Sequence, residues 1–304
     1  MISLVIPLKD ESSSLEKLFK DIKTIAQSGQ NKWEIIAVDD GSQDDTWQKL
    51  QQINITPIHL KGIKFSRNFG KEAAIYAGLS EATGNPVIVM DGDGQHPPSI
   101  LPEMIKKWQQ GALIVEAVKS KRPPEPFWKK ICTAFFYFIF EHSTGLDLRT
   151  ATDFKLLDRK VVQAYLNLPE RNRFFRGLIK WFNFPSQTIP FNPASRTEGI
   201  SSWSFTKLVS FAWSSIISFS VWPLRTLMII GILGVLASIG LLSQTLYSKI
   251  FGNAAPGFST IIILQTLLGS AILLGLGLIG EYLSRVYEEI KGRPLYVILE
   301  QIEK

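Results

Sequence analysis

Short apolar runs alternate with helix-periodic segments along the first third of the chain. The runs that are short enough for buried strands are Ile2 to Pro7, Trp33 to Val38, Gly62 to Ser66 and Pro86 to Met90. The segments with apolar positions at helical spacing are Ser12 to Ile25, Thr46 to Ile53 and Ala73 to Ala82. This alternation predicts an α/β fold in which crossover helices join the strands of a mainly parallel sheet.

The second half of the chain contains two long stretches without a charged residue, Thr226 to Ser248 and Ile250 to Gly280. Each exceeds the ~20 residues needed to cross a hydrocarbon core. We predict transmembrane helices at about 224–247 and 259–283, joined by a loop rich in helix breakers. The alternative is a pair of core helices in a soluble protein, but such helices usually keep a polar face. The pattern therefore favours a two-helix transmembrane hairpin.

The flanking charges predict the orientation of this hairpin. Arg225 precedes the first stretch and Arg285, Lys291 and Arg293 follow the second, whereas the connecting loop holds only Lys249. Because basic residues remain on the cytoplasmic side, both ends are predicted to be cytoplasmic. The N-terminal apolar run is too short for a signal peptide, and the single cysteine fits a reducing compartment. We expect an integral protein of the inner or plasma membrane with a cytoplasmic catalytic domain.

The chain divides into four predicted parts. Residues 1–200 form the catalytic domain, and residues 201–223 form aromatic-rich juxtamembrane helices suited to the membrane interface. Residues 224–285 hold the hairpin, and residues 286–304 form a cytoplasmic tail. The formal net charge of +6 and the pI near 9.2 fit a position beside anionic lipid headgroups. We find no motif typical of nucleic-acid binding, so a nucleic-acid partner is not expected.

An acidic motif follows the apolar run that ends at Met90. Asp91 and Asp93 are separated by one glycine and are followed by Gln95. Alternate residues of an extended chain point the same way, so both carboxylates can reach one cation, and Gly92 permits close approach of a diphosphate. Oxygen ligands of this kind suit Mg2+ or Mn2+. The alternative is an ordinary strand-ending turn, because Asp and Gly are common turn residues.

Polar clusters also follow the other predicted strands. In open parallel sheets the ligand site lies beyond the carboxyl ends of the strands, so these clusters should meet in one crevice. The residues that we assign to a nucleotide-sugar site are Pro7, Glu11, Asp39, Asp40, Lys71 and Asp91. Glu11 and Asp39 or Asp40 can accept hydrogen bonds from a base or ribose, with Asp39 favoured for uracil, and Lys71 can neutralise phosphate. Alternatively, Glu11 caps a helix, Asp40 belongs to a turn, and Lys71 is a solvated charge.

Five segments resemble a GT-A glycosyltransferase of family 2: VIPLKDE, VDDGSQDDT, FSRNFGKEAAIYAGL, DGDGQHPP and TDFKLLDR. More narrowly, the chain is similar to polyisoprenyl-phosphate glycosyltransferases, which include dolichol-phosphate mannose synthases and bactoprenol glucosyltransferases. The bactoprenol group is the closer match, because it shares PERNRFFRG, SFSVWPLR and GEYLSR. One departure is Lys9-Asp10, where relatives often carry an aromatic residue and Asn.

The resemblance implies transfer of a hexose, glucose by preference, from a UDP-sugar to polyprenyl phosphate with inversion. The lipid phosphosugar would then serve as a donor in cell-surface glycan modification, such as O-antigen modification. The implied ligands of Mg2+ or Mn2+ are Asp91, Asp93 and Gln95, and the implied catalytic residues are Asp93 and the acceptor-side Asp153. The acceptor phosphate is assigned to Arg122, Lys121, Lys129 and Lys130, since guanidinium and ammonium groups bind phosphate.

Three alternatives to this function remain at the level of the sequence. One is a mannose-type synthase that uses GDP-mannose. Another is a processive polysaccharide synthase, but those enzymes usually have more spans and a Gln-x-x-Arg-Trp motif, which the chain lacks. The third is a non-catalytic membrane or flippase partner, which would not need the acids of the metal site. Glycines within the spans permit helix association, so we expect a homo-oligomer, with a separate flippase as a possible partner.

Overall fold

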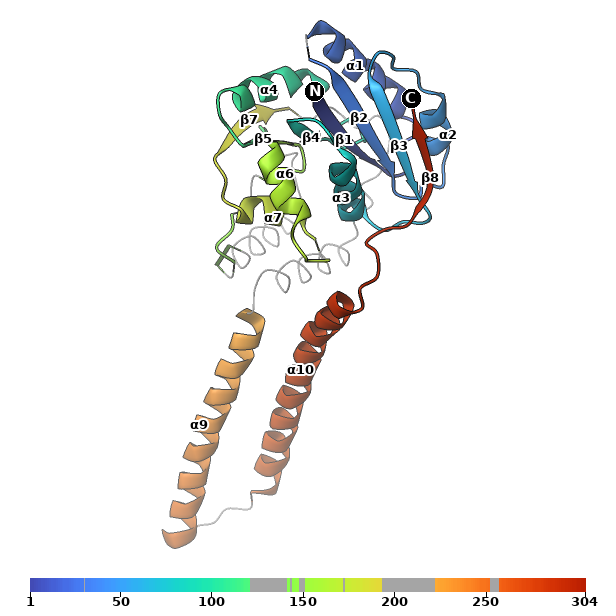
Figure 1. The fold of residues 1–304 in the computed structure, drawn as a ribbon. Helices are drawn as coiled ribbons and strands as arrows, with labels where there is room; N and C mark the ends of the chain where they lie inside the picture. The colour runs from blue at the N-terminus through green and yellow to red at the C-terminus, as the bar shows by residue number, and fades with distance from the viewer. Residues whose placement is uncertain are drawn as a thin grey trace. The chain divides into compact units, whose positions relative to one another are not determined.

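Strand β1 (Ile2–Leu8) lies inside an eight-stranded sheet whose order is β7-β5-β6-β4-β1-β2-β3-β8 (Figure 1). The structure is a computed structural model that describes residues 1–29, 31–120, 141–142, 144–147, 151–171, 173–192, 222–251 and 257–304. The other strands are β2 (Trp33–Asp39), β3 (His59–Phe65), β4 (Val87–Val89), β5 (Ile114–Lys119), β6 (Lys155–Leu157), β7 (Ser186–Phe191) and β8 (Ile298–Glu303).

The sheet is mainly parallel, as the sequence predicts. Strand β1 pairs in parallel with β2 and β4, β2 with β3, and β5 with β7. Strand β6 runs antiparallel between β4 and β5, and β8 runs antiparallel to β3 at the edge. Because the carboxyl ends of β1, β2, β3 and β4 share one direction, the segments after them emerge at the same end of the sheet.

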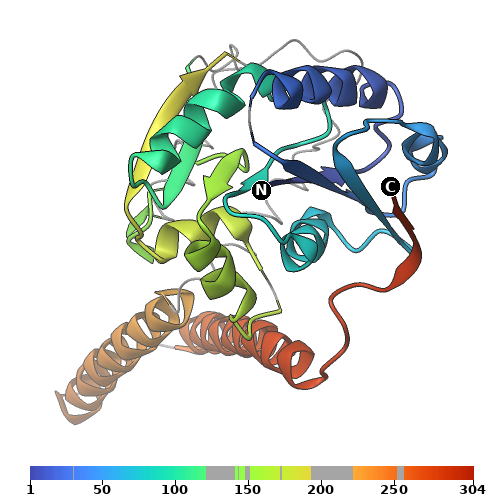
Figure 2. The same ribbon diagram turned by 45° about the horizontal axis from the view of Figure 1, so that its top comes forward.

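Helices cover both faces of this sheet (Figure 2). Those among the described residues are α1 (Leu15–Ser28), α2 (Thr46–Gln52), α3 (Lys71–Glu81), η1 (Pro98–Ile100), α4 (Leu101–Gln109), α6 (Arg159–Leu166) and α7 (Phe175–Trp181). Leu4, Ile6 and Leu8 share one face of β1 and join a buried cluster with Leu15 and Phe19 of α1. On the opposite face α3 approaches so closely that a Cβ at Gly78 would lie 2.2 Å from Val5 Cγ1.

Helix α1 and strand β3 begin at other residues than predicted, each for an identifiable reason. Helix α1 begins at Leu15 rather than Ser12, because the loop before it is hydrogen-bonded to the loop after β2: Ser12 N donates to Asp44 Oδ2 at 3.1 Å. Strand β3 begins at His59 rather than Gly62, because its first residues pair with β2. Both differences reflect partners that are distant in the sequence.

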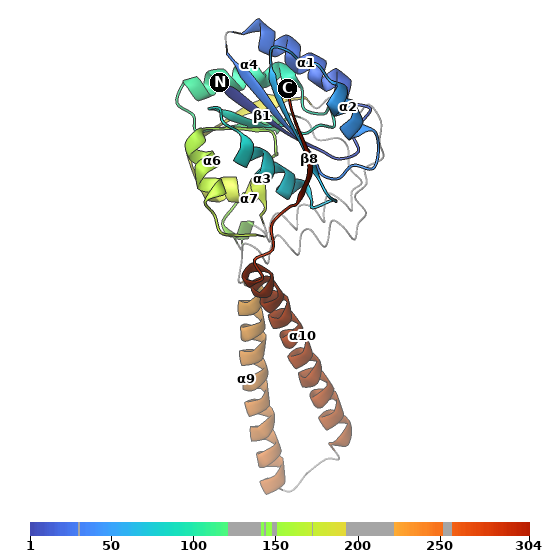
Figure 3. The ribbon, with the colours of Figure 1, turned by 45° about the vertical axis from the view of Figure 1, so that its right-hand side comes forward.

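The C-terminal residues, expected as a tail, contain strand β8. Residues Pro294–Lys304 belong to the same compact unit as Met1–Leu208. Strand β8 lies along β3 at the sheet edge (Figure 3), where Trp47 Nε1 donates to Glu300 Oε2 at 2.9 Å. Ile302 packs over Gly62, where a Cβ would lie 2.6 Å from Ile302 Cγ1. This first compact unit is therefore built from both ends of the chain.

The second compact unit, Val209–Arg293, contains helices α9 (Trp222–Phe251) and α10 (Phe258–Ile290). The two helices touch where Gly275 faces Leu227, whose Cδ2 would lie 3.0 Å from an added Cβ. Within the described residues, one segment, Leu267–Ile290, is long and apolar enough by length and composition to cross a membrane. Both predicted helices thus exist, whereas membrane crossing by the pair stays a prediction. The predicted juxtamembrane segment 201–223 lies outside the described residues up to 221.

Candidate active site

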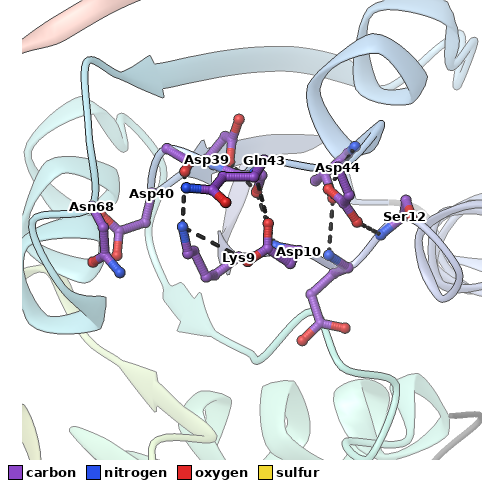
Figure 4. A network of polar contacts seen from close by, with 12 residues as sticks. Lys9, Asp10, Ser12, Asp39, Asp40, Gln43, Asp44 and Asn68 are labelled. Atoms are coloured by element: carbon purple, nitrogen blue, oxygen red, sulfur yellow. Dashed lines mark hydrogen bonds and ion pairs between the residues drawn. The ribbon is translucent and has the colours of Figure 1, made fainter. Parts of the chain in front are cut away.

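The loops after β1 and β2 are joined by reciprocal hydrogen bonds (Figure 4). Lys9 Nζ donates to Gly41 O at 2.8 Å, Asp10 N donates to Ser42 Oγ at 2.9 Å, and Gln43 N donates to Asp10 Oδ1 at 2.7 Å. Asp10 has a φ of 54°, a left-handed conformation that Asp tolerates better than most residues. Lys9 and Asp10 therefore hold one strand-end loop against the next.

Asp39 ends β2 with its side chain fully buried at 0% exposure. Its Oδ1 accepts hydrogen bonds from Ser42 N at 2.9 Å and from Ser42 Oγ at 2.5 Å. Its Oδ2 is buried and accepts no hydrogen bond from the described residues. A buried acceptor without a donor is costly, so a ligand N–H is a suitable partner for this oxygen.

Asp40 is bound by backbone amides instead. Phe69 N donates to its Oδ1 at 2.7 Å and Gly70 N donates to its Oδ2 at 3.0 Å. Burial raises the pKa of Asp40 even though these amides favour its ionised form. Gly41 follows with a φ of +64°, and a Cβ there would lie 2.6 Å from the Arg67 carbonyl carbon. Asp40 and Gly41 thus bring the loop after β3 against the loop after β2.

Two other predicted nucleotide-site residues lie at the end of β1. Pro7 is within the strand, paired with Val38 of β2. Glu11 lies in the loop, where its amide donates to Thr46 Oγ1 at 2.9 Å. Its side-chain Oε2 lies 3.3 Å from Ser14 Oγ, just before α1. Glu11 therefore lies in the turn before α1, whose N-cap position is occupied by Ser14.

The acidic motif forms a loop beyond β4. Asp93 Oδ1 accepts from Gln95 N at 3.0 Å, and Asp91 N donates to Nδ1 of His96 at 3.1 Å. A Cβ at Gly92 would lie 2.4 Å from Leu8 Cδ2, and Ser14 Oγ donates to Gly92 O at 2.7 Å. The missing side chain of Gly92 therefore allows packing against β1, a role that the sequence analysis did not anticipate.

Lys71, the first residue of α3, lies between two carboxylates. Its Nζ is 2.6 Å from Asp91 Oδ1 and 2.6 Å from Asp153 Oδ2. The Asp91 contact is close enough for an ion pair, although Asp91 Oδ1 accepts no well-aligned hydrogen bond within the described structure. Asp153 also accepts from Arg176 of α7, at 2.6 Å from Nε and 2.7 Å from Nη2. The side chains of Lys71, Asp91, Asp153 and Arg176, which we call the charge cluster, are thus in contact.

Burial and charge act in opposite directions within the charge cluster. Burial would raise the pKa of Asp153, but Lys71 and Arg176 outweigh it and hold this pKa well below the usual range. Burial likewise opposes the charge on Lys71, but Asp153 and Asp91 keep the pKa of its ammonium group above the ordinary value. Asp153 and Lys71 are therefore both charged near neutral pH, and the Lys71 side chain is still 41% exposed and able to meet an anionic ligand.

Glu72 follows Lys71 in the first turn of α3. Its Oε2 accepts from Phe175 N at 2.9 Å, at the start of the helix that carries Arg176. Burial, together with the Asp153 carboxylate, raises the pKa of Glu72 to about 8. Glu72 therefore keeps its proton at neutral pH.

Comparison with known proteins identifies the family of this chain. The model of Glycosyl transferase family 2 matches residues 3–166, which include the acidic motif and Asp153. The chain belongs to this family. It is a glycosyltransferase, and its mainly parallel α/β sheet is the GT-A fold.

Relatives of this family 2 glycosyltransferase extend over nearly its whole length. It is 38% identical over 299 residues to the uncharacterized glycosyltransferase sll0501 of Synechocystis, covering 98% of this chain and 94% of the relative. It is 35% identical over 301 residues to the SfII prophage-derived bactoprenol glucosyl transferase of Shigella flexneri, covering 98% of this chain and 97% of the relative.

Solved structures share the fold of the catalytic unit. The mannosyl-3-phosphoglycerate synthase of Rubrobacter xylanophilus matches with a TM-score of 0.50 at 13% identity, over 71% of each chain. TarS 1-349 of S. aureus, in complex with UDP-GlcNAc, matches with a TM-score of 0.50 at 14% identity, over 71% of this chain and 65% of TarS. At such identities the likeness concerns the fold alone.

The structure brings together some of the predicted site residues of this glycosyltransferase. Lys71, Asp91 and Asp153 are in contact, and the loop containing Asp93 and Gln95 continues from Asp91. Among the described residues, no group of three His, Cys, Asp or Glu side chains is arranged to hold an ion. Asp91, Asp93 and Gln95 nevertheless offer oxygen donors suited to Mg2+ or Mn2+, and Asp91 Oδ1 lacks an aligned donor. The predicted acceptor residues Arg122, Lys121, Lys129 and Lys130 lie outside the described residues.

Three contributors to the site were not assigned by the sequence analysis: Glu72, His96 and Arg176. His96 is 5% exposed and stacks on Phe154, with ring centroids 4.7 Å apart. Arg176 lies within the shared segment PERNRFFRG, so its position in a family-like motif was a usable signal. Glu72 and His96 are likewise neighbours of assigned residues, but their orientation depends on elements far away in the sequence.

Proposed function

We propose that this glycosyltransferase transfers a hexose, with glucose as the first candidate, from a UDP-sugar to polyprenyl phosphate with inversion. Its full-length similarity to bactoprenol glucosyl transferases supports a lipid phosphate acceptor. The lipid phosphosugar would serve as a donor for cell-surface glycan modification. The observation that carries the proposal is Lys71, whose ammonium joins the acid of the predicted metal motif to the acceptor-side Asp153.

In this proposal, Asp39 recognises the base of the donor. Its buried Oδ2 lacks a donor among the described residues, and the imide N–H of uracil supplies one. TarS, which shares the fold, was solved with UDP-GlcNAc. Because Ser42 holds the other oxygen of Asp39, the free oxygen is fixed in orientation before a ligand arrives. Asp40, whose carboxylate already binds two amides, is the weaker candidate for contact with the base.

Asp91, Asp93 and Gln95 would hold Mg2+ or Mn2+ beside the donor diphosphate. When bound, the ion would neutralise charge on the departing diphosphate as a Lewis acid. Lys71 reaches the same region and adds a positive charge that needs no coordination. The protein side of the site thus combines oxygen ligands with one ammonium group.

The proposed transfer is a single displacement. A nonbridging oxygen of the lipid phosphate attacks the anomeric carbon, the bond from that carbon to the diphosphate oxygen breaks, and the bonding electrons leave with UDP. The attacking oxygen is already anionic near neutral pH, so a strong base is not required. Asp153, ionised and held by Arg176, is suited to orienting basic groups that meet the acceptor. Arg122, Lys121, Lys129 and Lys130 remain the proposed ligands of the acceptor phosphate.

Helices α9 and α10 are proposed to anchor the enzyme in the inner or plasma membrane, with the catalytic unit in the cytoplasm. Large apolar side chains are exposed along both helices, including Leu233 at 60% and Leu273 at 72%. Apolar surface of this extent is favourable in lipid and unfavourable in water. A homo-oligomer and cooperation with a separate flippase belong to the same proposal.

The decisive experiment uses purified full-length protein with Mg2+, a short polyprenyl phosphate and a panel of UDP- and GDP-sugars. Mass spectrometry of the lipid fraction should detect one hexosyl phosphate product with a UDP-hexose. Failure of every donor with folded protein would refute the enzymatic proposal, and a product from GDP-mannose alone would favour the mannose-type alternative. Asp93→Asn should abolish transfer without affecting membrane insertion.

A further inference from the structure

A buried ion pair lies beside the segment that carries Asp153 of the charge cluster. Glu116 of β5 and Lys155 of β6 face each other across an antiparallel pairing and form an ion pair. Glu116 is 7% exposed and Lys155 is 2% exposed. Neither residue has a part in donor binding or transfer as proposed above, so their burial needs another explanation.

The ion pair is attached to the residue before Asp153. Thr152 N donates to Glu116 Oε1 at 3.0 Å, the same oxygen that Lys155 Nζ contacts. Thr152 Oγ1 also donates to Ala117 O at 2.5 Å. The backbone and the side chain of Thr152 are therefore both bound to β5, one by the side chain of Glu116 and one by the strand itself.

The residue after Asp153 is fixed as well. Ala117 N donates to Phe154 O at 3.0 Å, and the Phe154 ring is fully buried against His96. Asp153 is thus held between two residues anchored to β5. Only the Thr152 amide depends on a side chain for its acceptor, because Glu116 supplies the oxygen that no backbone group provides there.

Stability alone is a poor reason for such a pair. Taking two charges out of water is expensive, and apolar residues of similar volume often replace a buried ion pair at no cost in stability. Leucine at Glu116 and methionine at Lys155 would fill the same space, but they would leave the buried Thr152 amide without an acceptor. Lys155 then has a clear role as the counter-charge of Glu116, whose Oε1 it contacts.

We propose that Glu116 is a positioning residue for Asp153, with Lys155 as its counter-charge. The carboxylate of Glu116 fixes the Thr152 amide, and through it the direction in which the Asp153 side chain meets Lys71 and Arg176. The inference rests on the proposed role of Asp153 in transfer. A shift of about 1 Å in a positioned group can lower turnover by about a hundredfold, so removing the acceptor should act on kcat.

The test compares two double variants of the full-length enzyme. Glu116→Leu with Lys155→Met removes the pair and the acceptor, whereas Glu116→Gln with Lys155→Met removes both charges but keeps an oxygen for Thr152. We expect the first to lower kcat at least about tenfold with the UDP dissociation constant unchanged, and the second to stay within about threefold of the parent. Unchanged UDP binding shows that the first variant is folded. A general structural defect would lower both kcat and UDP affinity, rather than kcat alone.

Parent-like kcat in the Leu/Met variant would overturn the proposal. Equal losses in both double variants would also overturn it, because they would mean that charge rather than the bond to Thr152 matters. If the Leu/Met variant fails to bind UDP, Glu116→Asp replaces it, since the shorter side chain withdraws the acceptor from Thr152 N but keeps the charge. Parent-like turnover of Glu116→Asp would also overturn the proposal. Asp153→Asn, measured in parallel, separates the proposed role of Asp153 in transfer from the proposed role of Glu116 in positioning it. Undiminished transfer in that variant refutes the role of Asp153 itself.

Discussion

Lys71 Nζ lies 2.6 Å from Asp153 Oδ2, although the two residues are 82 positions apart in the sequence. The same nitrogen is 2.6 Å from Asp91 Oδ1. One ammonium group at the start of α3 therefore connects the loop after β4 to the segment that enters β6. Substrate phosphates that approach either acid would meet this positive charge.

Replacing Lys71 with methionine should lower turnover by about a hundredfold or more. The diphosphate loses a positive charge, and the carboxylates of Asp91 and Asp153 lose the ammonium group that lies between them. Donor affinity should also fall, as measured by calorimetric titration with UDP. Lys61→Met is the matched control, since Lys61 pairs with Glu81 at 2.5 Å at the opposite end of β3. Comparable activity of the Lys71 and Lys61 variants would contradict a role for Lys71 in the site.

Asp39→Asn should weaken UDP binding about tenfold to hundredfold, because a carboxylate acceptor for the base becomes an amide whose NH2 group can face a base N–H. The kcat at saturating donor should change less than the affinity. Asp45→Asn serves as the control, because Asp45 is exposed in the same loop and its side chain makes no capping hydrogen bond. Equal UDP affinity for parent and Asp39→Asn would remove Asp39 from the base site.

Glu72 predicts a specific dependence of stability on pH. Its pKa rises from 4.5 to about 8 in the folded protein. Between about pH 4.5 and about pH 8 the unfolded chain releases this proton while the folded protein keeps it, so stability falls as pH rises through that window. Asp153 has a lowered pKa, so its contribution is present in this window and is lost only below about pH 3.8.

Glu72→Gln should remove this decline, since the neutral amide cannot ionise yet keeps an oxygen for Phe175 N. Urea unfolding in mild detergent at about pH 5 and about pH 8 should show the variant gaining about 1–3 kcal/mol over the parent at the higher pH. A parent whose stability is flat across the window would show that Glu72 is not protonated in the folded protein.

Tyr296 connects the C-terminal strand to the loop after β3. Its ring stacks on Phe65 with centroids 4.8 Å apart, and Val297 O accepts from Ser66 N at 2.9 Å. Tyr296→Ala should lower the free energy of unfolding by about 1–3 kcal/mol and speed amide exchange at Ser66, because the stacked ring and its burial are lost. Tyr296→Phe keeps the ring and should behave as the parent. Slow exchange at Ser66 in the alanine variant would mean that β8 holds without this contact.

Much of the site follows from local patterns. The alternation of strands and helices places Asp39, Lys71 and Asp91 after successive parallel strands, and parallel strands carry such residues to the same end of the sheet. The apolar stretches predicted two long helices, because helix length and lack of charge are properties of the local chain. The sequence therefore predicted the main parallel sheet and the closeness of Asp39, Lys71 and Asp91.

Local sequence patterns did not predict which distant segments pair with one another. Strand β8 has no strong local signal, and it forms because β3 offers an unpaired edge and because Gly62 leaves room for Ile302. The contacts of Arg176 with Asp153, of Glu72 with Phe175, and of Glu116 with Thr152 all join elements whose adjacency depends on the complete sheet order. Periodicity along a chain fixes which face of an element is apolar, whereas the partner of each polar group depends on which elements finally pack together.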